Sequence, residues 1–212
     1  MEALGMFEVY SFTAAVCAAD VAAKAADVRV IAFDRNRPIR TDVPAPLVME
    51  AKLEGNVAAV RAAVDAAEHY AREQGKFIVS HVIANPADSV EKMAYLLDIN
   101  KDKYNKKLPK SFLGVTEPPA PVHAAIGLLE VQGLVASIEG LDAMVKAADV
   151  HVIHTEKRLG GRLVTLVITG SVSAVTAAIE AGQSAASPLG KVYGQAVIAN
   201  PHPEITKFFD FA

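Results

Sequence analysis

The sequence predicts an α+β fold made of two tandem copies of one small domain. Three observations indicate this: early segments of the chain return in its second half, short β-rich runs alternate with helical spacings of apolar residues, and Gly, Asn or Pro punctuates these runs. The 212 residues leave room for two such domains, and a hydrophobic content of 52% supplies material for both cores.

The repeat is carried by segments that match at a constant offset. Three segments of the first copy return in the second: 3–9 as 125–131, 20–28 as 142–150, and 82–86 as 197–201. The first two pairs are offset by 122 residues and the third by 115, so the first copy holds seven extra residues. These fall between Val28 and Gly55, where three prolines predict an ordered loop outside regular structure.

Each copy is predicted to run strand, helix, strand, loop, strand, helix, strand and short helix. In the second copy the predicted strands are 126–131, 150–154, 163–169 and 192–198. The first helix of this copy is indicated by apolar residues at helical spacing: Val135, Ile138, Leu141 and Val145. The last strand ends before Asn200-Pro201, because proline cannot continue a β-ladder.

The second helix of each copy is predicted from its cap and its apolar spacing. Ser171 is a candidate N-cap, and Asn56 holds the same place in the first copy. The inner faces of these helices are expected to carry Val172, Val175 and Ile179 in one copy and Val57, Val60 and Val64 in the other.

With both helices on one face of each sheet, every copy forms an α+β sandwich whose other face must be covered or used. The predicted domains are residues 1–98 and 123–212, and residues 99–122 form a linker rich in Lys and Pro. Its prolines favour an extended spacer.

Composition excludes several classes of function. A net charge of −3 gives no general attraction to nucleic acid or to an anionic membrane, and no stretch is long and apolar enough to span a bilayer. The single cysteine, Cys17, is expected to be buried and inert, which fits a reducing cytosol, and the N-terminus lacks a secretory signal pattern.

The sequence also lacks recognisable catalytic and metal-binding motifs. It contains no Gly-rich phosphate loop, no Gly-x-Ser-x-Gly elbow and no His-Glu-x-x-His pattern. His151 and His154 are expected on opposite faces of one strand, where they could not easily share a metal. We therefore expect no enzyme activity, no catalytic residues, no metal and no cofactor.

The second copy resembles a bacterial microcompartment shell domain, a ferredoxin-like α/β sandwich, over nearly its full length. The matching residues are 125–130, 142–148, Gly160-Gly161 before 163–165, and 198–202. The first copy resembles the same domain, with its enlarged loop as the main departure. The chain is thus similar to the tandem-domain, trimeric class of these shell proteins.

This resemblance implies an assembly. Three chains with two domains each would form a pseudohexagonal homotrimer, and a closed ring leaves a hole on its axis. Such a tile would join other shell proteins, hexameric and pentameric, in a microcompartment shell in the cytoplasm, and would pass small metabolites through its central pore. A small-molecule-binding regulatory trimer is the alternative, although a doubled domain with edge lysines is not needed for that role.

The resemblance also implies which residues line the pore. They are Arg35, Asn36, Arg37, Pro38, Ile39 and Arg40 from the first copy and Leu159, Gly160, Gly161 and Arg162 from the second. Threefold rings of arginine would favour small anionic or polar metabolites, tempered by Asp34, Asp42 and Glu156. Gly160-Gly161 serves equally well in an ordinary hairpin turn.

Four further residues match positions at the edge of a tile: Lys24, Lys146, Asn85 and Asn200. In the family the lysine packs against its symmetry mate in the next tile, whereas the simpler interpretation is a solvated lysine on a helix. The two asparagines stand where many relatives have an arginine that crosses the edge. Asparagine has fewer donors and no charge, so lateral contacts are expected to differ in strength.

Overall fold

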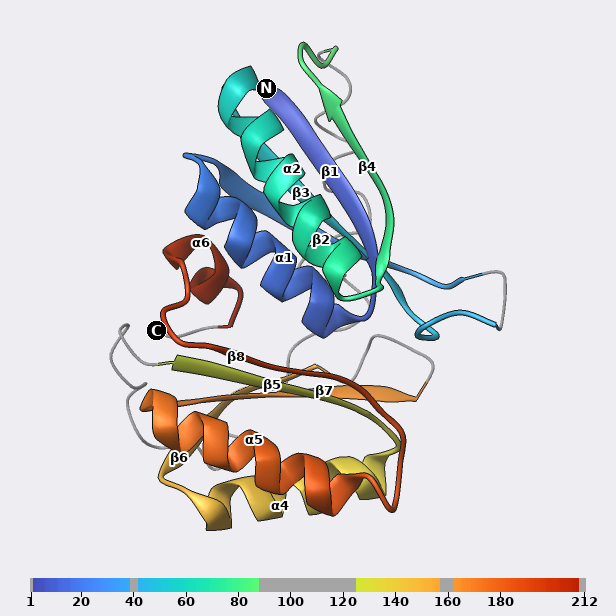
Figure 1. The fold of residues 1–212 in the computed structure, drawn as a ribbon, viewed down its shortest axis with the longest axis vertical. Coiled ribbons are helices and arrows are strands. Elements are labelled where there is room, and N and C mark those ends of the chain that lie inside the picture. Colours follow the sequence, from blue (N-terminus) through green and yellow to red (C-terminus); the bar gives the residue numbers. More distant parts are fainter. Residues whose placement is uncertain (1, 39–41, 88–124, 157–161, 210–212) are drawn as a thin grey trace.

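The computed structural model describes residues 2–38, 42–87, 125–156 and 162–209 and confirms two domains of one α+β topology (Figure 1). The first domain comprises β1 (Ala3–Tyr10), α1 (Phe12–Ala25), β2 (Arg29–Asn36), β3 (Val48–Gly55), α2 (Val57–Glu73) and β4 (Phe77–Ile83). The second comprises β5 (Ala125–Gln132), α4 (Leu134–Ala147), β6 (Val150–Glu156), β7 (Leu163–Gly170), α5 (Val172–Ala186), β8 (Val192–Ile198), α6 (Pro203–Thr206) and the 3-10 helix η2 (Lys207–Phe209). The predicted linker, 99–122, lies outside the described residues.

Each domain holds a four-stranded antiparallel sheet, which we call the first sheet and the second sheet. The strand orders are β2-β3-β1-β4 and β6-β7-β5-β8, so the two topologies are the same. The irregularities of the ladders also recur. The β2–β3 register shifts at Val30/Ala32 and the β6–β7 register at Val152/His154, an offset of 122 residues. The repeat therefore extends from the sequence to the local path of the backbone.

Side-chain caps start four of the described helices, the short α6 among them, where His202 Nδ1 accepts from the Glu204 N–H. The hydroxyls of Ser11 and Ser171 and the amide oxygen of Asn56 each accept a hydrogen bond from a first-turn backbone N–H. The predicted caps Asn56 and Ser171 are thus confirmed. At the start of α4 the cap position is Gly133, with φ of 103°, and it has no side chain to accept a hydrogen bond.

Glycines on the central strands let the second helix of each domain lie close on its sheet. A Cβ at Gly5 would lie 2.6 Å from Val60 Cγ1, and one at Gly127 would lie 2.7 Å from Val175 Cγ1. These contacts place α2 and α5 on the same face of each sheet as the preceding helix, which packs beside them. The expected sandwich, with both helices on one face, is confirmed.

The predicted inner faces of α2 and α5 are correct except at their first residues. Val60, Val64, Val175 and Ile179 are buried. Val57 and Val172 are 37% and 48% exposed, so their assignment to the inner face was wrong. Each is the first residue of its helix, where the chain is still leaving the sheet.

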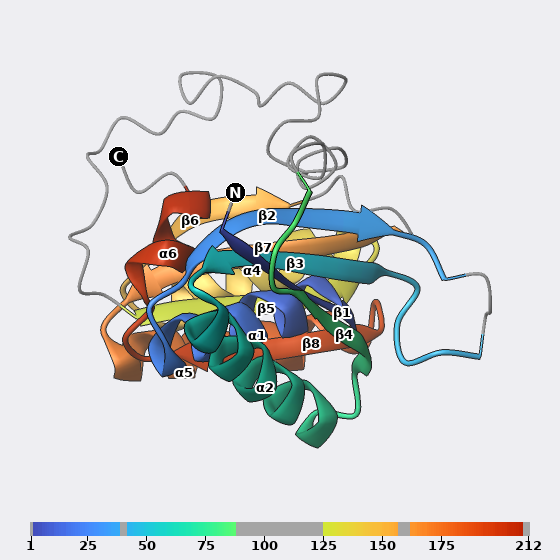
Figure 2. The same ribbon diagram turned by 90° about the horizontal axis from the view of Figure 1, so that it is seen from above.

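Helix α1 lies between the two sheets (Figures 1 and 2). One side of α1 covers the first sheet, and the other side contacts β5 and β8 on the face of the second sheet that α4 and α5 leave free. One hydrophobic cluster accordingly joins α1 residues such as Phe12 and Val16 to Ile126, Leu128 and Val167. None of the described helices is both long and apolar enough to cross a membrane.

Substitution Gly127→Ala is expected to lower the free energy of unfolding by about 1–3 kcal/mol, because the added methyl group overpacks the contact between β5 and α5. Three side-chain carbons, from Val175, Ile168 and Ile179, would lie within 2.9 Å of it. Urea unfolding followed by circular dichroism measures the change. The control Ala177→Ser, on the exposed side of α5, is expected to stay within about 0.5 kcal/mol. Equal stability of both variants would contradict the close contact.

Candidate functional site

The joint between the domains is organised around Glu130, a fully buried residue of β5. Its Oε1 accepts from the Phe12 N–H at 3.3 Å and its Oε2 from the Thr13 N–H at 3.0 Å. The first amides of a helix have no partner within the helix and carry partial positive charge, so a carboxylate is favourable there. The second domain therefore caps the first helix of the first domain.

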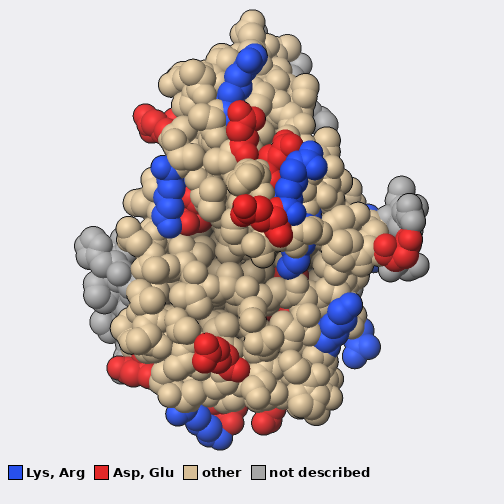
Figure 3. Space-filling view, viewed as in Figure 1, with Lys and Arg blue, Asp and Glu red and all other residues tan. Residues whose placement is uncertain are grey.

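At this end of the joint the backbones of α1 and β8 also approach each other closely. A Cβ at Gly194 on β8 would lie 2.9 Å from Thr13 Cβ, so glycine allows α1 to come this near. Lys76 Nζ donates to the Tyr193 carbonyl at 2.7 Å. Burial lowers the pKa of Lys76, and the nearby Glu130 carboxylate opposes that shift. In the view of Figure 3 the area where the domains meet is largely uncharged.

The opposite end of α1 is held by Asp20. Its Oδ1 accepts from the His202 N–H at 2.8 Å, and its Oδ2 accepts from Lys24 Nζ at 2.6 Å. Nearby, Glu204 Oε2 accepts from the Val30 N–H at 2.6 Å. Both ends of α1 are thus tied to the second domain by carboxylate hydrogen bonds, which are stronger than neutral ones.

Helix α4 is the repeat counterpart of α1, but its outer side has no described cover. Every residue of α1 from Phe12 to Asp20 is buried. In α4 the counterparts of Phe12, Thr13 and Val16 are 65%, 71% and 60% exposed; they are Leu134, Val135 and Ile138. The apolar spacing found in the sequence was real, and the structure shows that much of it faces away from the second sheet.

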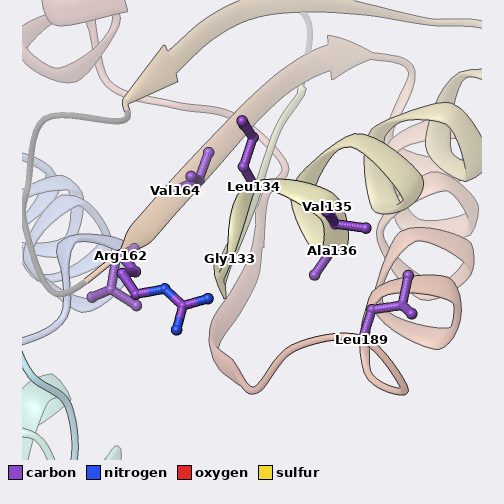
Figure 4. Close-up of a pocket in the computed structure, with 8 residues that line it drawn as sticks. Gly133, Leu134, Val135, Ala136, Arg162, Val164 and Leu189 are labelled. Carbon is purple, nitrogen blue, oxygen red and sulfur yellow. The ribbon is translucent and has the colours of Figure 1, made fainter.

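A hollow of about 640 Å³ lies at the start of α4 (Figure 4). It is formed by the first turn of α4, the start of β7 and the turn after α5; its lining residues are Gly133, Leu134, Val135, Ala136, Arg162, Leu163, Val164 and Leu189. The Arg162 guanidinium lies at one side of the hollow and Leu189 at the other (Figure 4). The hollow is mainly apolar, with one cationic side chain at its rim.

The predicted edge residues occupy the far ends of α1 and α4 and the ends of β4 and β8. All four, Lys24, Lys146, Asn85 and Asn200, are exposed. Through Asp20 the chain brings Lys24 beside His202, two residues after Asn200. Lys146 makes the equivalent bond on α4, donating to Asp142 at 2.5 Å, but Asp142 is exposed, whereas Asp20 is buried. A role for these residues at the edge of a tile stays a prediction.

The predicted pore residues fall partly within the described chain. Arg35 and Asn36 end β2, Arg37 and Pro38 follow, and Arg162 precedes β7; Ile39, Arg40, Leu159, Gly160 and Gly161 lie outside the described residues. Strands β2 and β6 end on the same side of the molecule (Figures 1 and 2), so the loops that follow them start on one side. Asn36, Arg37 and Arg162 are exposed and Arg35 is half-buried, and lining a pore remains a prediction.

Of the three acidic residues expected to temper the arginines, Asp42 is exposed and the other two are not. Asp34 and Glu156 are buried, and Asp34 forms an ion pair with the buried Lys52. Burial raises the pKa of Asp34, while the hydrogen bond from Lys52 opposes that rise. These two carboxylates therefore contribute little negative charge to the surface beside Arg35 and Arg37.

His151 and His154 share one face of β6, and Cys17 lies in the core of the first domain. The expectation that His151 and His154 lie on opposite faces was wrong, because the bulge after Val152 pairs them with Thr169 and Val167, which share a face. No group of three His, Cys, Asp or Glu among the described residues is placed to hold a metal. Cys17 is buried as predicted, and burial raises its pKa to about 11, so it stays a neutral thiol at pH 7.

Sequence reasoning missed the residues that form the joint, namely Asp20, Glu130, Gly194 and Glu204. Two of them carried a usable signal. Asp20 and Glu130 each recur in the other copy, as Asp142 and Glu8, inside segments that are otherwise apolar. A carboxylate kept in both copies within an apolar segment indicates a specific partner, because burying an unpaired charge is costly.

Comparison with known proteins matches both halves of the chain to one family. The BMC domain family matches residues 3–86 and 125–201. The bacterial microcompartment shell protein PduA of Citrobacter freundii is 46% identical over 83 residues, which is 39% of this chain and 88% of PduA. The shell protein EutM of Escherichia coli is 44% identical over 85 residues, 40% of this chain and 87% of EutM.

A third relative covers both domains. The carboxysome assembly protein CcmO of Synechococcus elongatus is 31% identical over 199 residues, which is 94% of this chain but only 65% of CcmO. Among solved structures, a microcompartments protein from Desulfitobacterium hafniense shares 22% identity over 98% of this chain and 99% of its own, with a TM-score of 0.39. A TM-score this low does not bear on how the two domains are arranged.

Substitution Glu130→Ala is expected to lower the free energy of unfolding by about 1–3 kcal/mol, because it leaves the buried Phe12 and Thr13 amides without an acceptor. Urea unfolding of the full chain measures the loss. The control Glu130→Gln keeps one acceptor oxygen and is expected to lose less. An unchanged unfolding midpoint in Glu130→Ala would mean that this cap does not hold the domains together.

Proposed function

Because the chain belongs to the BMC domain family, we propose that it is a structural shell protein of a bacterial microcompartment, sited in the shell within the cytoplasm. Two of the relatives, PduA and EutM, are named as shell proteins, and the relative that matches both domains, CcmO, is named for carboxysome assembly. A structural role also accords with the absence of any catalytic motif in the sequence.

The proposed assembly is a ring of three chains and six domains. The observation that carries it is the exposed outer side of α4, the counterpart of the side of α1 that the second sheet covers within the chain. This relation between the domains is head to tail: the first domain presents its helix, and the second presents the free face of its sheet. A head-to-tail interface leaves one unused surface of each kind, and a closed ring uses both. Six such domains match the pseudohexagonal tile that the family resemblance implies.

A central pore follows from closing the ring. The loops after β2 and β6 start on one side of each chain, so three chains would direct three of each toward the axis. Arg35, Arg37 and Arg162 would then form threefold sets of positive charge, while Asp34 and Glu156 are buried. Repeated like charges around a narrow passage attract ions of opposite sign. The proposed cargo is therefore a small anionic or polar metabolite.

The full chain is expected to have three times its 22.4 kDa mass in size-exclusion chromatography with light scattering, and to form flat sheets or tubes when concentrated. The double variant Lys24→Ala/Lys146→Ala is expected to keep this mass but lose the sheets in negative-stain electron microscopy. A monomer at every concentration would refute the tile. Discrete trimers that form no sheets and gain stability with a small molecule would support a regulatory trimer instead.

The variant Arg37→Ala is expected to reduce the passage of a small anion several-fold relative to a cation of similar size, because three positive charges leave the passage. Flux through the assembled shell, or conductance of the trimer in a supported layer, measures the ratio. Arg61→Ala, which removes the same charge from an exposed position near the start of α2, at the opposite end of that helix from the loop, is the matched control. An unchanged anion-to-cation ratio in Arg37→Ala would contradict a pore lined by this residue.

A further inference from the structure

We propose that Glu8 of a second copy of this chain caps helix α4, as Glu130 caps α1 within the chain. Glu8 of this second chain would accept hydrogen bonds from the Leu134 and Val135 amides, and the sheet that carries Glu8 would cover the exposed apolar residues beside them. This inference rests on the proposed ring and adds the contact that closes it. The occupant of the α4 surface is thus the first domain of another copy.

The template for this contact is the joint inside the chain. There Glu130 bonds the first two amides of α1, and Thr13 packs on Gly194 of β8. With the offset of 122 residues, the equivalent of Glu130 in the first domain is Glu8. The equivalents of Phe12 and Thr13 in the second domain are Leu134 and Val135. The same set of residue positions is therefore present a second time, divided between the two ends of one chain.

The acceptor side of this second set is available. Glu8 pairs with Glu50 and Val79 in the first sheet, just as Glu130 pairs with Thr165 and Gly194 in the second. Because Gly5 faces α2 and strand side chains alternate, Glu8 points to the face away from the helices. No hydrogen bond or ion pair with another described residue engages the Glu8 carboxylate.

The donor side is available as well. The cap position Gly133 has no side chain to accept from the first amides of α4. Leu134, Val135 and Ile138 are at least 60% exposed beside these amides. Arg162 lines the same hollow (Figure 4), so an incoming carboxylate would also meet a guanidinium that the joint inside the chain lacks. A mainly apolar surface with one cationic rim residue fits the apolar and acidic face that carries Glu8.

The contact between copies cannot reproduce the internal joint in every detail. Within the chain Thr13 meets a glycine, Gly194, whereas between copies Val135 would meet Val79, which is 49% exposed. Two valines need more space than threonine against glycine, so α4 must stand slightly farther from the partner's β4. The added methyl groups increase the apolar area that the contact buries.

A disulfide tests this placement directly. In the double variant Val79→Cys/Val135→Cys, oxidation is expected to link different copies and to give covalent trimers on a non-reducing denaturing gel. The geometry of the internal joint supports this expectation. A Cβ at Gly194 would lie 2.9 Å from that of Thr13, and the slightly wider contact between copies approaches the separation of about 3.5–4.5 Å that a disulfide needs. Cys17 is buried with its pKa raised to about 11, so it stays out of the reaction.

The single variants Val79→Cys and Val135→Cys are the matched controls and are expected to stay uncrosslinked. Covalent trimers in the double variant alone support the contact. An assembly that remains trimeric by light scattering but does not crosslink would overturn this inference and leave the ring standing. A chain that is monomeric before oxidation would overturn both.

Removing each carboxylate in turn distinguishes the cap between chains, made by Glu8, from the cap within the chain, made by Glu130. Glu8→Ala is expected to raise the concentration at which trimers dissociate by at least about tenfold while leaving the unfolding of the single chain nearly unchanged. Glu130→Ala, its repeat counterpart, is expected to destabilise the chain itself. Glu8→Gln keeps one acceptor and is expected to fall between Glu8→Ala and the unaltered chain. Equal trimer dissociation in all Glu8 variants would refute the cap.

Discussion

The burial of α1 between two sheets is the constraint on which the rest of this molecule depends. Phe12 and Val16 belong to one hydrophobic cluster with Ile126 and Leu128 of the other domain. Separating the domains would expose that cluster and leave the buried Glu130 carboxylate without its amide donors. Both changes are costly in free energy, so the domains hold one arrangement. That arrangement sets how any further domain can be added, because each domain has the same two kinds of surface.

The two domains share the features that form the fold and differ in the surfaces that contact a neighbouring domain. The bulges, the strand orders and the glycines at 5 and 127 are shared. The contact surfaces differ. Gly194 occupies the position in the repeat that is equivalent to Val79, and Val167 occupies the position equivalent to Lys52. A ring of these chains would therefore alternate between two kinds of joint, one within chains and one between them. Its symmetry would be threefold even though its outline repeats six times.

Much of the fold could be predicted from the sequence, because a repeat doubles every local signal. The caps Asn56 and Ser171 and the valines behind them follow from short-range chemistry, and the structure confirms them. Helical spacing could not show that Val135 and Ile138 point outward, because periodicity identifies a face but not its partner. Alternation likewise failed for His151 and His154, where one bulged residue moves both to the same side. The joint residues were missed because Glu130 acts on amides more than a hundred positions away.

The longer loop of the first copy begins and ends beyond the last paired residues of its hairpin, Asn36 and Val48. None of the residues that tie α1 to the second domain lies within this segment. The end of the segment belongs to the scaffold, because Ala45 and Leu47 are fully buried and the Leu47 carbonyl accepts from the Ser11 N–H just before α1. Length and composition can therefore vary only in the part before Ala45, where Asp42 and Pro44 are exposed. In the proposed tile, natural variation or a grafted peptide in that part of the loop would change what the pore admits and leave the joint between the domains unaltered.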